Sequence, residues 1–433
     1  MGADATSCCA EVIVGLPGFV VLAAGEYGGE LELLVETTAT EICCGQCGTR
    51  AVVHDRREHL LRDVPVAGRA TVLVWWKRIW RCPNPACAMR TWTEQSPLAR
   101  PRQSLTARAK AWVTRRVGAD GETVSSVARS LGVGWWSVMR AVVEVGRPMV
   151  DDPARLADVS GLGVDEHAWQ RANAVRNTQY ATGVVGLRAN RPARLLEVVP
   201  GRSGRVYGDW LAQRPDCWRE QITVAALDPF RGYLNALREH LPGATHVLDA
   251  FHVTALGMKV VDEVRRRVQQ DTLHRRGHKG DPLYEVRRLL RRRADRLSPG
   301  AIARLDTALA AGDPTGEVTV AWWAAQQLCL AYAKTDLASG RAHAAKLIDD
   351  FLDCPIPEVS RLGRTLAMWR KEFLAYFDTG RASNGPTEAV NLLVEKIRRI
   401  GHGYRRFDHY RLRLLLHCGI DWPTLIPPRI RRR

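Results

Sequence analysis

The spacing of hydrophobic and polar positions changes several times along the 433 residues. Between about residues 30 and 100, stretches such as LELLVET and ATVLVWWKRIWRC alternate with period two and predict β-strands. From about 102 to 147 the apolar residues recur at helical spacing. From about 160 the segments follow the order β-β-β-α-β-α-β, and from about 253 to 380 they are almost all helical. A chain of this length and pattern predicts several domains of multidomain α+β class.

Four acidic residues stand where a strand or helix is expected to end or begin. Asp165 in GVDEHAW, Asp228 in VAALDPFRGY and Asp249 in HVLDAFHV follow short apolar runs. Glu388 in SNGPTEAVNLLVEKIRR opens an amphipathic helix, where an acid also suits the helix dipole. Distant carboxylates at the tips of buried elements form the oxygen-rich pockets that Mg²⁺ prefers. This arrangement in a basic chain favours a metal-dependent enzyme that acts on DNA.

The strand and helix order matches the ribonuclease-H-like fold. In that fold the acids sit on the first strand, the fourth strand and a late helix, which here correspond to Asp165, Asp228 and Glu388. The second acid stays open between Asp228 and Asp249, because both end a strand. Strand order favours Asp228, because it places this residue beside Asp165.

The helix that begins near Glu388 carries further polar candidates on one side. We hypothesise that Asn384 and Asn391 orient the metal site or the DNA, and that Lys396 and Arg399 hold phosphate groups.

Two cysteine pairs lie beside the expected strands near the N-terminal end. Cys44-x2-Cys47 and Cys82-x4-Cys87 have spacings that close a tetrahedral Zn²⁺ site. Cys43 is an alternative to Cys44 as a zinc ligand. The alternative to a zinc site is that these cysteines are buried or incidental. We expect a small, strand-poor, zinc-ribbon-like module that depends on zinc for its folding.

The segment ETVSSVARSLGVGWWSVMRAVVEVG has helix-turn-helix spacing. A helix over SSVARSL is followed by a turn at residues 132–134 and a second helix over WWSVMRAVVEV. The second helix would present Trp136, Ser137 and Arg140 to a major groove. A plain helical linker remains the alternative, and paired tryptophans here and at 322–323 are expected in the core rather than on bases.

The net charge of +17 favours a polyanionic partner, with nucleic acid first and an anionic membrane second. The charge is concentrated between residues 265 and 296 and again from 396 to the tail PPRIRRR. Within YEVRRLLRRRADRL, four arginines are expected on one helical face and are candidates for DNA contact: Arg287, Arg288, Arg291 and Arg292.

The first residues show no basic stretch of a signal peptide, and no run of about 18 apolar residues predicts a membrane span. We therefore expect a cytoplasmic protein without a membrane partner. In a reducing compartment the 11 cysteines are candidate metal ligands or buried thiols rather than disulfides.

The motifs GVDEHAW, ALDPFRGY with LPGATHVLDAFHV, and SNGPTEAVNLLVEKIRRIGHGYRRFDHYRLRLLL resemble the DDE transposases of bacterial insertion sequences of the ISL-three type. The resemblance covers nearly the whole chain, and the last two blocks are its most specific parts. It implies DNA transposition at terminal inverted repeats, with Asp165, Asp228 and Glu388 as the catalytic acids. Asp249 and His252 match an accessory D-x2-H motif of related transposases.

The expected domain boundaries follow from these motifs. Residues 1–100 form the zinc-binding module, 101–155 the helix-turn-helix, 156–252 the first part of the ribonuclease-H-like catalytic core, 253–380 a helical insertion, and 381–433 the last core helix and the basic tail.

The expected cofactors are two Mg²⁺ or Mn²⁺ ions at the acids and a structural Zn²⁺. The expected partners are double-stranded DNA, as transposon ends and target, and further copies of the chain in a homodimer or larger assembly. A non-catalytic DNA-binding regulator or decayed transposase is the first alternative function. A nuclease of the same fold without strand transfer is the second.

Overall fold

The computed structural model of the chain describes residues 14–188 and 190–423, and these form two compact units. Among the described residues, one unit contains 14–152, 397–402 and 408–423, and the other contains 153–188, 190–396 and 403–407.

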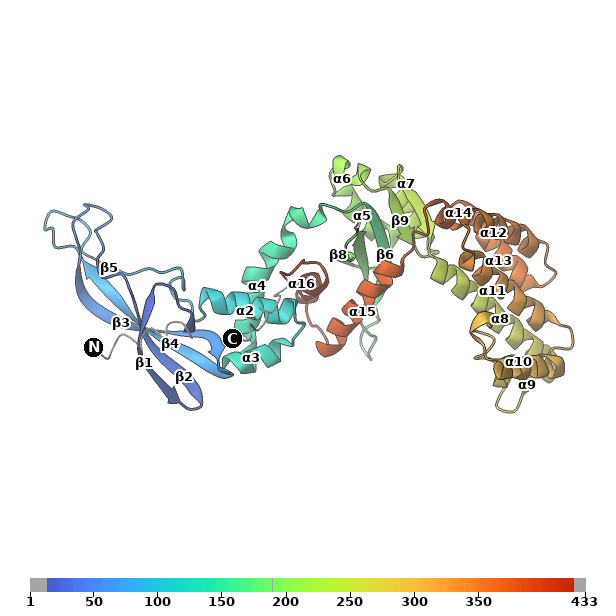
Figure 1. The fold of residues 1–433 in the computed structure, drawn as a ribbon, viewed down its shortest axis with the longest axis horizontal. Helices are drawn as coiled ribbons and strands as arrows, with labels where there is room; N and C mark the ends of the chain where they lie inside the picture. The colour runs from blue at the N-terminus through green and yellow to red at the C-terminus, as the bar shows by residue number, and fades with distance from the viewer. Residues whose placement is uncertain (1–13, 189, 424–433) are drawn as a thin grey trace, which may run out of the picture. The chain divides into compact units, whose positions relative to one another are not determined.

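A five-stranded sheet opens the first unit (Figure 1). Its strands run in the order β1-β2-β4-β3, with β5 beside β4. Their bounds are β1 (Phe19–Tyr27), β2 (Glu30–Thr37), β3 (Val52–Val66), β4 (Arg69–Arg81) and β5 (Thr91–Thr93). The sheet has its own apolar core, which includes Phe19, Leu73 and Trp75. The expectation of a strand-poor module is therefore wrong.

Strands β3 and β4 form one long hairpin, with its tip in the stretch DVPVAGRA. Val66 pairs with Arg69, and the two residues between them, Ala67 and Gly68, have φ angles of 51° and 78°. Two consecutive positive φ angles are the geometry of the tight turn that suits the twist of a β-hairpin.

The helix-turn-helix follows the sheet in the same unit. It contains α2 (Ala107–Gly118), α3 (Val124–Leu131) and α4 (Trp135–Asp151). The hydroxyl of Thr123 accepts a hydrogen bond from the Ser126 amide and caps α3, and Gly132, with φ 67°, ends that helix in the left-handed conformation. The predicted turn between α3 and α4 is confirmed.

The last described helix, α16 (Phe407–Cys418), packs against the helix-turn-helix. Leu416 lies against Gly118 and Gly146, where glycines leave room for its side chain, and His417 Nδ1 lies 2.8 Å from the carbonyl oxygen of Gly118. The expected single block 381–433 is thus divided between the two units, because α16 buries leucines in the helical core of the first unit. The PPRIRRR tail lies outside the described residues.

The second unit contains a mixed sheet in the order β10-β9-β6-β7-β8. Strands β6, β7 and β8 are antiparallel neighbours, and β9 and β10 run parallel to β6. The elements are β6 (Gly161–Gln170), β7 (Gln179–Leu187), β8 (Arg194–Pro200), α5 (Gly204–Ala212), α6 (Asp216–Glu220), β9 (Val224–Leu227), α7 (Arg231–His240) and β10 (Thr245–Leu248). This confirms the expected β-β-β-α-β-α-β order, with the short α6 added.

The alternation along β6 decides which residues face the site. Leu162 and Val164 belong to the apolar core that also contains the inward side chains of α5 and α7. Because successive side chains of a strand point to opposite faces, Gly163 and Asp165 point to the other face of the sheet.

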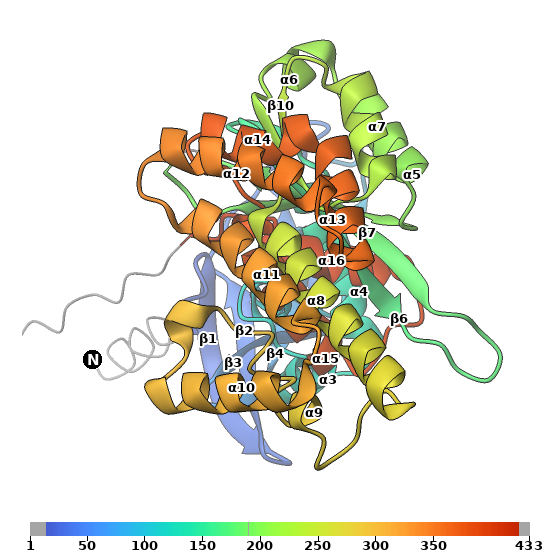
Figure 2. The ribbon, with the colours of Figure 1, turned by 90° about the vertical axis from the view of Figure 1, so that its right-hand side faces the viewer.

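Along the chain, a series of helices lies between β10 and the helix that carries Glu388. It consists of α8 (Ala250–Leu273), α9 (Pro282–Glu285), α10 (Pro299–Gly312), α11 (Glu317–Ala333), α12 (Leu337–Leu352), α13 (Pro357–Met368) and α14 (Arg370–Asp378), and α15 (Gly385–Ile400) follows. Figure 2 shows α8 and α11 packed beside each other. None of the helices in the described ranges is long and apolar enough to cross a membrane.

The predicted arginine face on one helix over residues 284–297 is wrong. Helix α9 ends at Glu285, and turns follow before a 3₁₀ segment at Ala294–Arg296. A continuous helix would place Arg287 over Arg291 and Arg288 over Arg292, and like charges four residues apart destabilise a helix. Arg287 instead stacks on the ring of Tyr284, with 3.8 Å between its Cζ and the ring centroid.

Candidate active site and zinc centre

Three aspartates form a row across neighbouring strands of the second unit. In the parallel register Gly163 pairs with Ala226, and Leu227 pairs with Leu248. Two residues after Gly163 comes Asp165, while Asp228 and Asp249 directly follow the paired leucines. Continued by two steps between β6 and β9 and by one step between β9 and β10, the register sets the three aspartates side by side, with neighbouring strands about 4.8 Å apart. Asp165 was expected at the end of its strand, but it lies within β6, which continues to Gln170 in its hairpin with β7.

Asp249 is the first residue of a helical turn rather than part of a strand. The predicted strand THVLDAFHV ends at Leu248, and Asp249 caps α8 by accepting a hydrogen bond from the His252 amide over 3.2 Å. The motif D-x-x-H explains this result, because an aspartate at this position binds the free amides of the first helical turn.

His252 lies between two of the acids. Its Nδ1 atom is 3.0 Å from Asp228 Oδ1 and 3.1 Å from Asp249 Oδ2. Burial by itself lowers the pKa of His252, but the hydrogen bonds to Asp228 and Asp249 outweigh burial and raise the pKa to about 10. The side chain is therefore an imidazolium at neutral pH that balances part of the negative charge.

Helix α15 brings Glu388 and two asparagines to the same face of the sheet. The backbone amide of Asn384 donates to Asp249 Oδ1 over 2.9 Å, and its Nδ2 donates to Asp228 Oδ1 over 3.3 Å. Asn391 Nδ2 donates to Asp165 Oδ2 over 2.5 Å. All four predicted acids, His252 and both predicted asparagines thus meet in one region of the second unit.

Gly163 allows α15 to approach the sheet this closely. A Cβ atom built on Gly163 would lie 1.9 Å from Thr387 Oγ1 and 2.6 Å from Asn384 Oδ1. Any other residue at position 163 would push the first turn of α15, which carries Glu388, away from β6.

The carboxylates repel one another. Burial and the nearby charge of Asp228 raise the pKa of Asp165 to about 7. Burial also raises the pKa of Glu388, with His252 opposing and Asp228 and Asp249 adding to the rise. Asp249 differs, because hydrogen bonds from His252 and from the Asn384 amide outweigh its burial and lower its pKa. An excess of buried negative charge that the protein does not neutralise is typical of a cation site.

Tyr233 is a neighbour of this site that carries no functional signal in the sequence. The Tyr233 hydroxyl on α7 donates to Glu166 Oε2 over 3.1 Å and lies 3.3 Å from Thr182 Oγ1. This network fixes β6 at the residue after Asp165. Tyr233 falls on the apolar stripe of α7, so its sequence pattern indicated only a core residue.

Four cysteine thiols in the first unit form a compact cluster. The Sγ atoms of Cys44, Cys47, Cys82 and Cys87 all lie within 4.8 Å of one another. The Cys44–Cys87 distance is 3.8 Å and the Cys47–Cys82 distance is 3.5 Å. Tetrahedral Zn–S bonds of about 2.3 Å place the sulfur atoms about 3.8 Å apart, so the four thiols fit Zn²⁺. Cys43 is exposed and stands outside the cluster, which decides the open choice in favour of Cys44.

The pKa differs from one thiol of this cluster to the next. Hydrogen bonds with the side chain and the backbone of Thr49 lower the pKa of Cys47 to about 6. Burial raises the pKa of Cys82 to about 12 and also raises that of Cys87.

The candidate DNA-contacting residues are mostly exposed. Trp136 and Arg140 are exposed on α4, and Ser137 is half-buried. Lys396 and Arg399 are exposed near the end of α15. Trp323, which was expected in the core, is 52% exposed, and its neighbour Trp322 is buried as expected. Trp135 is also partly exposed, so the expectation of core tryptophans holds for only part of this set.

Comparison with known proteins agrees with this geometry. A transposase family model of the ISL3 type matches residues 162–414, more than half of the chain. The model of the helix-turn-helix domain of transposase family ISL3 matches residues 94–146, and that of the zinc-finger of transposase IS204/IS1001/IS1096/IS1165 matches residues 40–87. No curated protein matches the chain.

Among solved structures, the chain is similar to a Drosophila P element transposase in its strand transfer complex. The identity is 12% and the TM-score 0.38, over 71% of this chain and 90% of that one. A likeness at this level adds nothing to the assignment, which rests on the three family models and on the four-cysteine cluster. The chain therefore belongs to the ISL3 family of transposases.

Proposed function

We propose that the protein binds the ends of a bacterial insertion sequence, cleaves a DNA strand there and transfers the freed 3′ end to target DNA. Asp165, Asp228 and Glu388 are the metal-holding acids in this proposal. The observation that carries it is the row of aspartates within β6 and directly after β9 and β10, with α15 placing Glu388 on the same face of the sheet.

The residues at this site fit divalent cations of the Mg²⁺ class. The donors are carboxylate oxygens, which Mg²⁺ and Mn²⁺ prefer to nitrogen or sulfur. Burial, together with the negative charge of Asp228, raises the pKa of Asp165, and a bound cation would neutralise that charge. When bound, two such ions polarise the scissile phosphate and acidify the attacking water. Unlike the four thiols, the acids do not form one tight cluster among the described residues.

Contacts within the site favour Asp228 over Asp249 as the second acid. Both carboxylate oxygens of Asp249 are occupied, one by the Asn384 amide and the other by His252, and its side chain is only 3% exposed. Asp228 is 18% exposed and uses one oxygen, Oδ1, for its contacts with His252 and Asn384. We assign Asp249 to positioning His252 and α15, and Asp228 to the metal site.

The other polar residues orient the acids. Asn391 donates to Asp165 Oδ2, and the Glu166 amide donates to Asp165 Oδ1 over 2.7 Å, so both oxygens of this acid are held in place. Asn384 ties the start of α15 to the ends of β9 and β10. The 3′ hydroxyl freed by hydrolysis then takes the place of water as the nucleophile on a target phosphodiester, so one set of acids serves both steps.

The remaining parts of the chain supply DNA recognition in this proposal. The four cysteines hold a structural Zn²⁺, and α4 presents Trp136, Ser137 and Arg140 to base edges. Lys396 and Arg399 provide salt-dependent phosphate contacts. Residues 156–252 and the start of α15 form the catalytic part, with 253–380 inserted. Two DNA ends must be joined in one complex, so the active form is a homodimer or larger.

Cleavage of DNA that carries the element's own ends tests this proposal. The full-length protein is incubated with Mg²⁺ or Mn²⁺, and wild type is compared with Asp228→Asn and Asp249→Asn. We expect cleavage to be lost in Asp228→Asn and only weakened in Asp249→Asn. The reverse result would move the metal site to Asp249. End-specific binding without any cleavage by the wild type would identify a DNA-binding regulator instead.

A further inference from the structure

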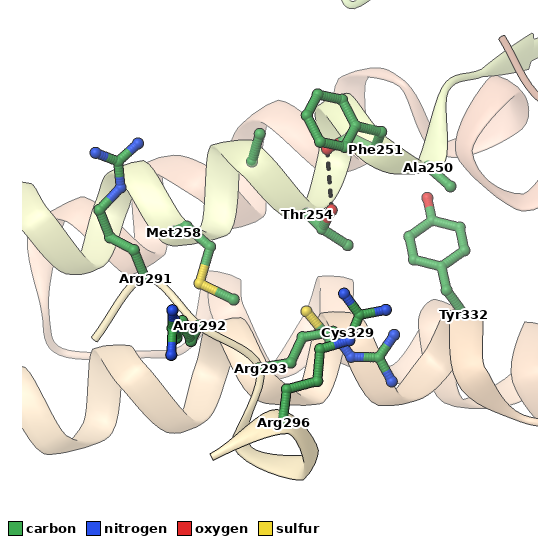
Figure 3. Close-up of a pocket in the computed structure, with 11 residues that line it drawn as sticks. Ala250, Phe251, Thr254, Met258, Arg291, Arg292, Arg293, Arg296, Cys329 and Tyr332 are labelled. Atoms are coloured by element: carbon green, nitrogen blue, oxygen red, sulfur yellow. Dashed lines mark hydrogen bonds between the residues drawn. The ribbon is translucent and has the colours of Figure 1, made fainter. Parts of the chain in front are cut away.

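A cavity of about 830 Å³ lies beside the N-terminal half of α8 in the second unit (Figure 3). Phe251 and Met258 of α8 line it together with Tyr332 of α11, and the turn segment 291–296 completes the wall. The volume is within the range of about 300–1,000 Å³ that is typical of small-ligand sites. Neither the proposed metal site nor the helix-turn-helix uses this cavity.

The turn segment gives the cavity a strong positive charge. Four arginines of this segment line the wall: Arg291, Arg292, Arg293 and Arg296. Arg293 is paired with Asp295 over 2.6 Å, but the other three have no carboxylate within 4.0 Å among the described residues. Unpaired guanidinium groups that line one cavity favour a ligand with phosphate oxygens.

Hydrogen bonds to α11 hold this arginine segment in place. The buried side chain of Gln326 accepts from the Ala294 amide over 2.7 Å and donates to the Arg292 carbonyl over 3.1 Å. The turn that replaced the expected helix is thus fixed by specific contacts, and it presents its guanidinium groups from a rigid backbone.

The opposite part of the wall is apolar and aromatic. The Phe251 ring is 66% exposed, and Met258 and Tyr332 contribute further apolar surface. An exposed aromatic ring at a cavity wall offers a flat apolar face on which a ligand can stack. Planar bases stack on such rings, and arginines beside them hold the adjoining phosphates.

The cavity adjoins the acids through the first turn of α8. Asp249 caps this helix and Phe251 follows two residues later, with 5.5 Å between the ring centroids of Phe251 and His252. When a DNA strand is held at the acids, the neighbouring nucleotides of that strand can therefore reach the cavity. Bases in an intact duplex face one another, so only an unpaired base can enter.

We propose that this cavity binds an unpaired nucleotide of the DNA strand beside the cleavage site, with its base on Phe251 and its phosphate on Arg292 and Arg296. The inference rests on the proposed function, because it takes the strand from the acids to the cavity. A free nucleotide shares the same chemistry, and the test separates the two sources.

Binding of forked DNA tests the proposal without requiring catalysis. The full-length protein is titrated in Ca²⁺ against a blunt duplex and against the same duplex with a short unpaired flap, and binding is followed by fluorescence anisotropy. We expect the wild type to prefer the forked DNA by roughly ten-fold, the effect of one stacked base. Phe251→Ala and Arg296→Ala should remove this preference, and Phe251→Trp should keep it.

The controls distinguish the cavity from general charge. Arg276 is exposed and lies outside the cavity. Arg276→Ala should therefore weaken binding of both DNAs alike and keep the ratio of their affinities. Circular dichroism establishes that each variant is folded. An unchanged preference in folded Phe251→Ala or Arg296→Ala would overturn the proposal.

The same titration in the presence of a nucleoside triphosphate separates the two sources of nucleotide. Saturable binding of the triphosphate that depends on Phe251 and Arg296, together with no preference for forked DNA, would assign the cavity to a free nucleotide and overturn the proposal. Failure of cleavage in Mg²⁺ would contradict the proposed function and leave the binding ratio measurable.

Discussion

Gly163 gives a sharp test of how the sheet and α15 assemble the site. In Gly163→Ala the new methyl carbon would lie 1.9 Å from Thr387 Oγ1 and 2.6 Å from Asn384 Oδ1. Overpacking of a close contact costs about 1–3 kcal/mol. Because two atoms overlap and both belong to the start of α15, we expect a loss near 3 kcal/mol in the stability of the second unit.

The contact also predicts a specific rescue. Thr387 Oγ1 is buried and has no hydrogen-bond partner among the described residues, so its removal breaks no polar contact. Thr387→Ala should therefore recover about 1 kcal/mol or more of the Gly163→Ala loss, which is a coupling typical of residues in direct contact. Gly243→Ala is the matched control, because a Cβ on Gly243 meets nothing within 4 Å and the variant should be neutral.

Hydrogen exchange of peptides from β6 and α15 during denaturant titration measures these stabilities within the second unit. Cleavage should fall more than the folded fraction does in Gly163→Ala, because Glu388 moves with the first turn of α15. Stability equal to wild type in Gly163→Ala, or no coupling with Thr387→Ala, would refute the close approach of α15 to β6.

Three further predictions address other parts of the molecule. The folded-state pKa of Asp165 is raised to about 7, from about 3.9 in the unfolded chain, so the folded state binds more protons between these values. The metal-free protein should therefore lose stability as pH rises from about 4 to 7. Asp165→Asn should reduce this loss, and Mn²⁺ should reverse it near pH 7. Thermal unfolding measured across this pH range tests both effects. Cys82→Ser should abolish stoichiometric zinc while Cys43→Ser keeps it, and elemental analysis of the purified proteins decides this. Arg140→Ala should weaken discrimination between end DNA and random DNA by about 1–3 kcal/mol, whereas Arg147→Ala at the other end of α4 should change it little, as competition binding will show.

Much of the second unit was predictable because its strands carry local signals. The apolar runs before Asp228 and Asp249 end where the strands end, and α15 begins just before Glu388. The alternation of β6 placed Asp165 on a strand but did not locate the end of that strand, since β6 continues through its pairing with β7. Strand length is decided by the partner strand, which is distant in sequence.

Other features depended on tertiary contacts that no local pattern contains. The sequence of residues 286–293 has helical spacing, but repulsion between its arginines disfavours a helix. Hydrogen bonds between Gln326 and the backbone of Arg292 and Ala294 hold the end of the segment in turns. Likewise, α16 follows α15 closely in sequence but packs with the helix-turn-helix, because Leu416 fits against two distant glycines. The role of Gly163 likewise depends on Thr387 and Asn384, which are distant from it in sequence.

Strand transfer by the full-length protein tests the central claim most directly. Pre-cleaved end DNA with a 3′ hydroxyl is incubated with a supercoiled target plasmid and Mg²⁺, using wild type, Asp165→Asn and Glu388→Gln, and a 3′-dideoxy end as control. We predict covalent joining by the wild type with the 3′ hydroxyl alone, and none by either variant in spite of retained end binding. Joining that persists in Asp165→Asn or Glu388→Gln would contradict the assignment of these acids, and no joining by an end-binding, DNA-cleaving wild type would indicate a nuclease.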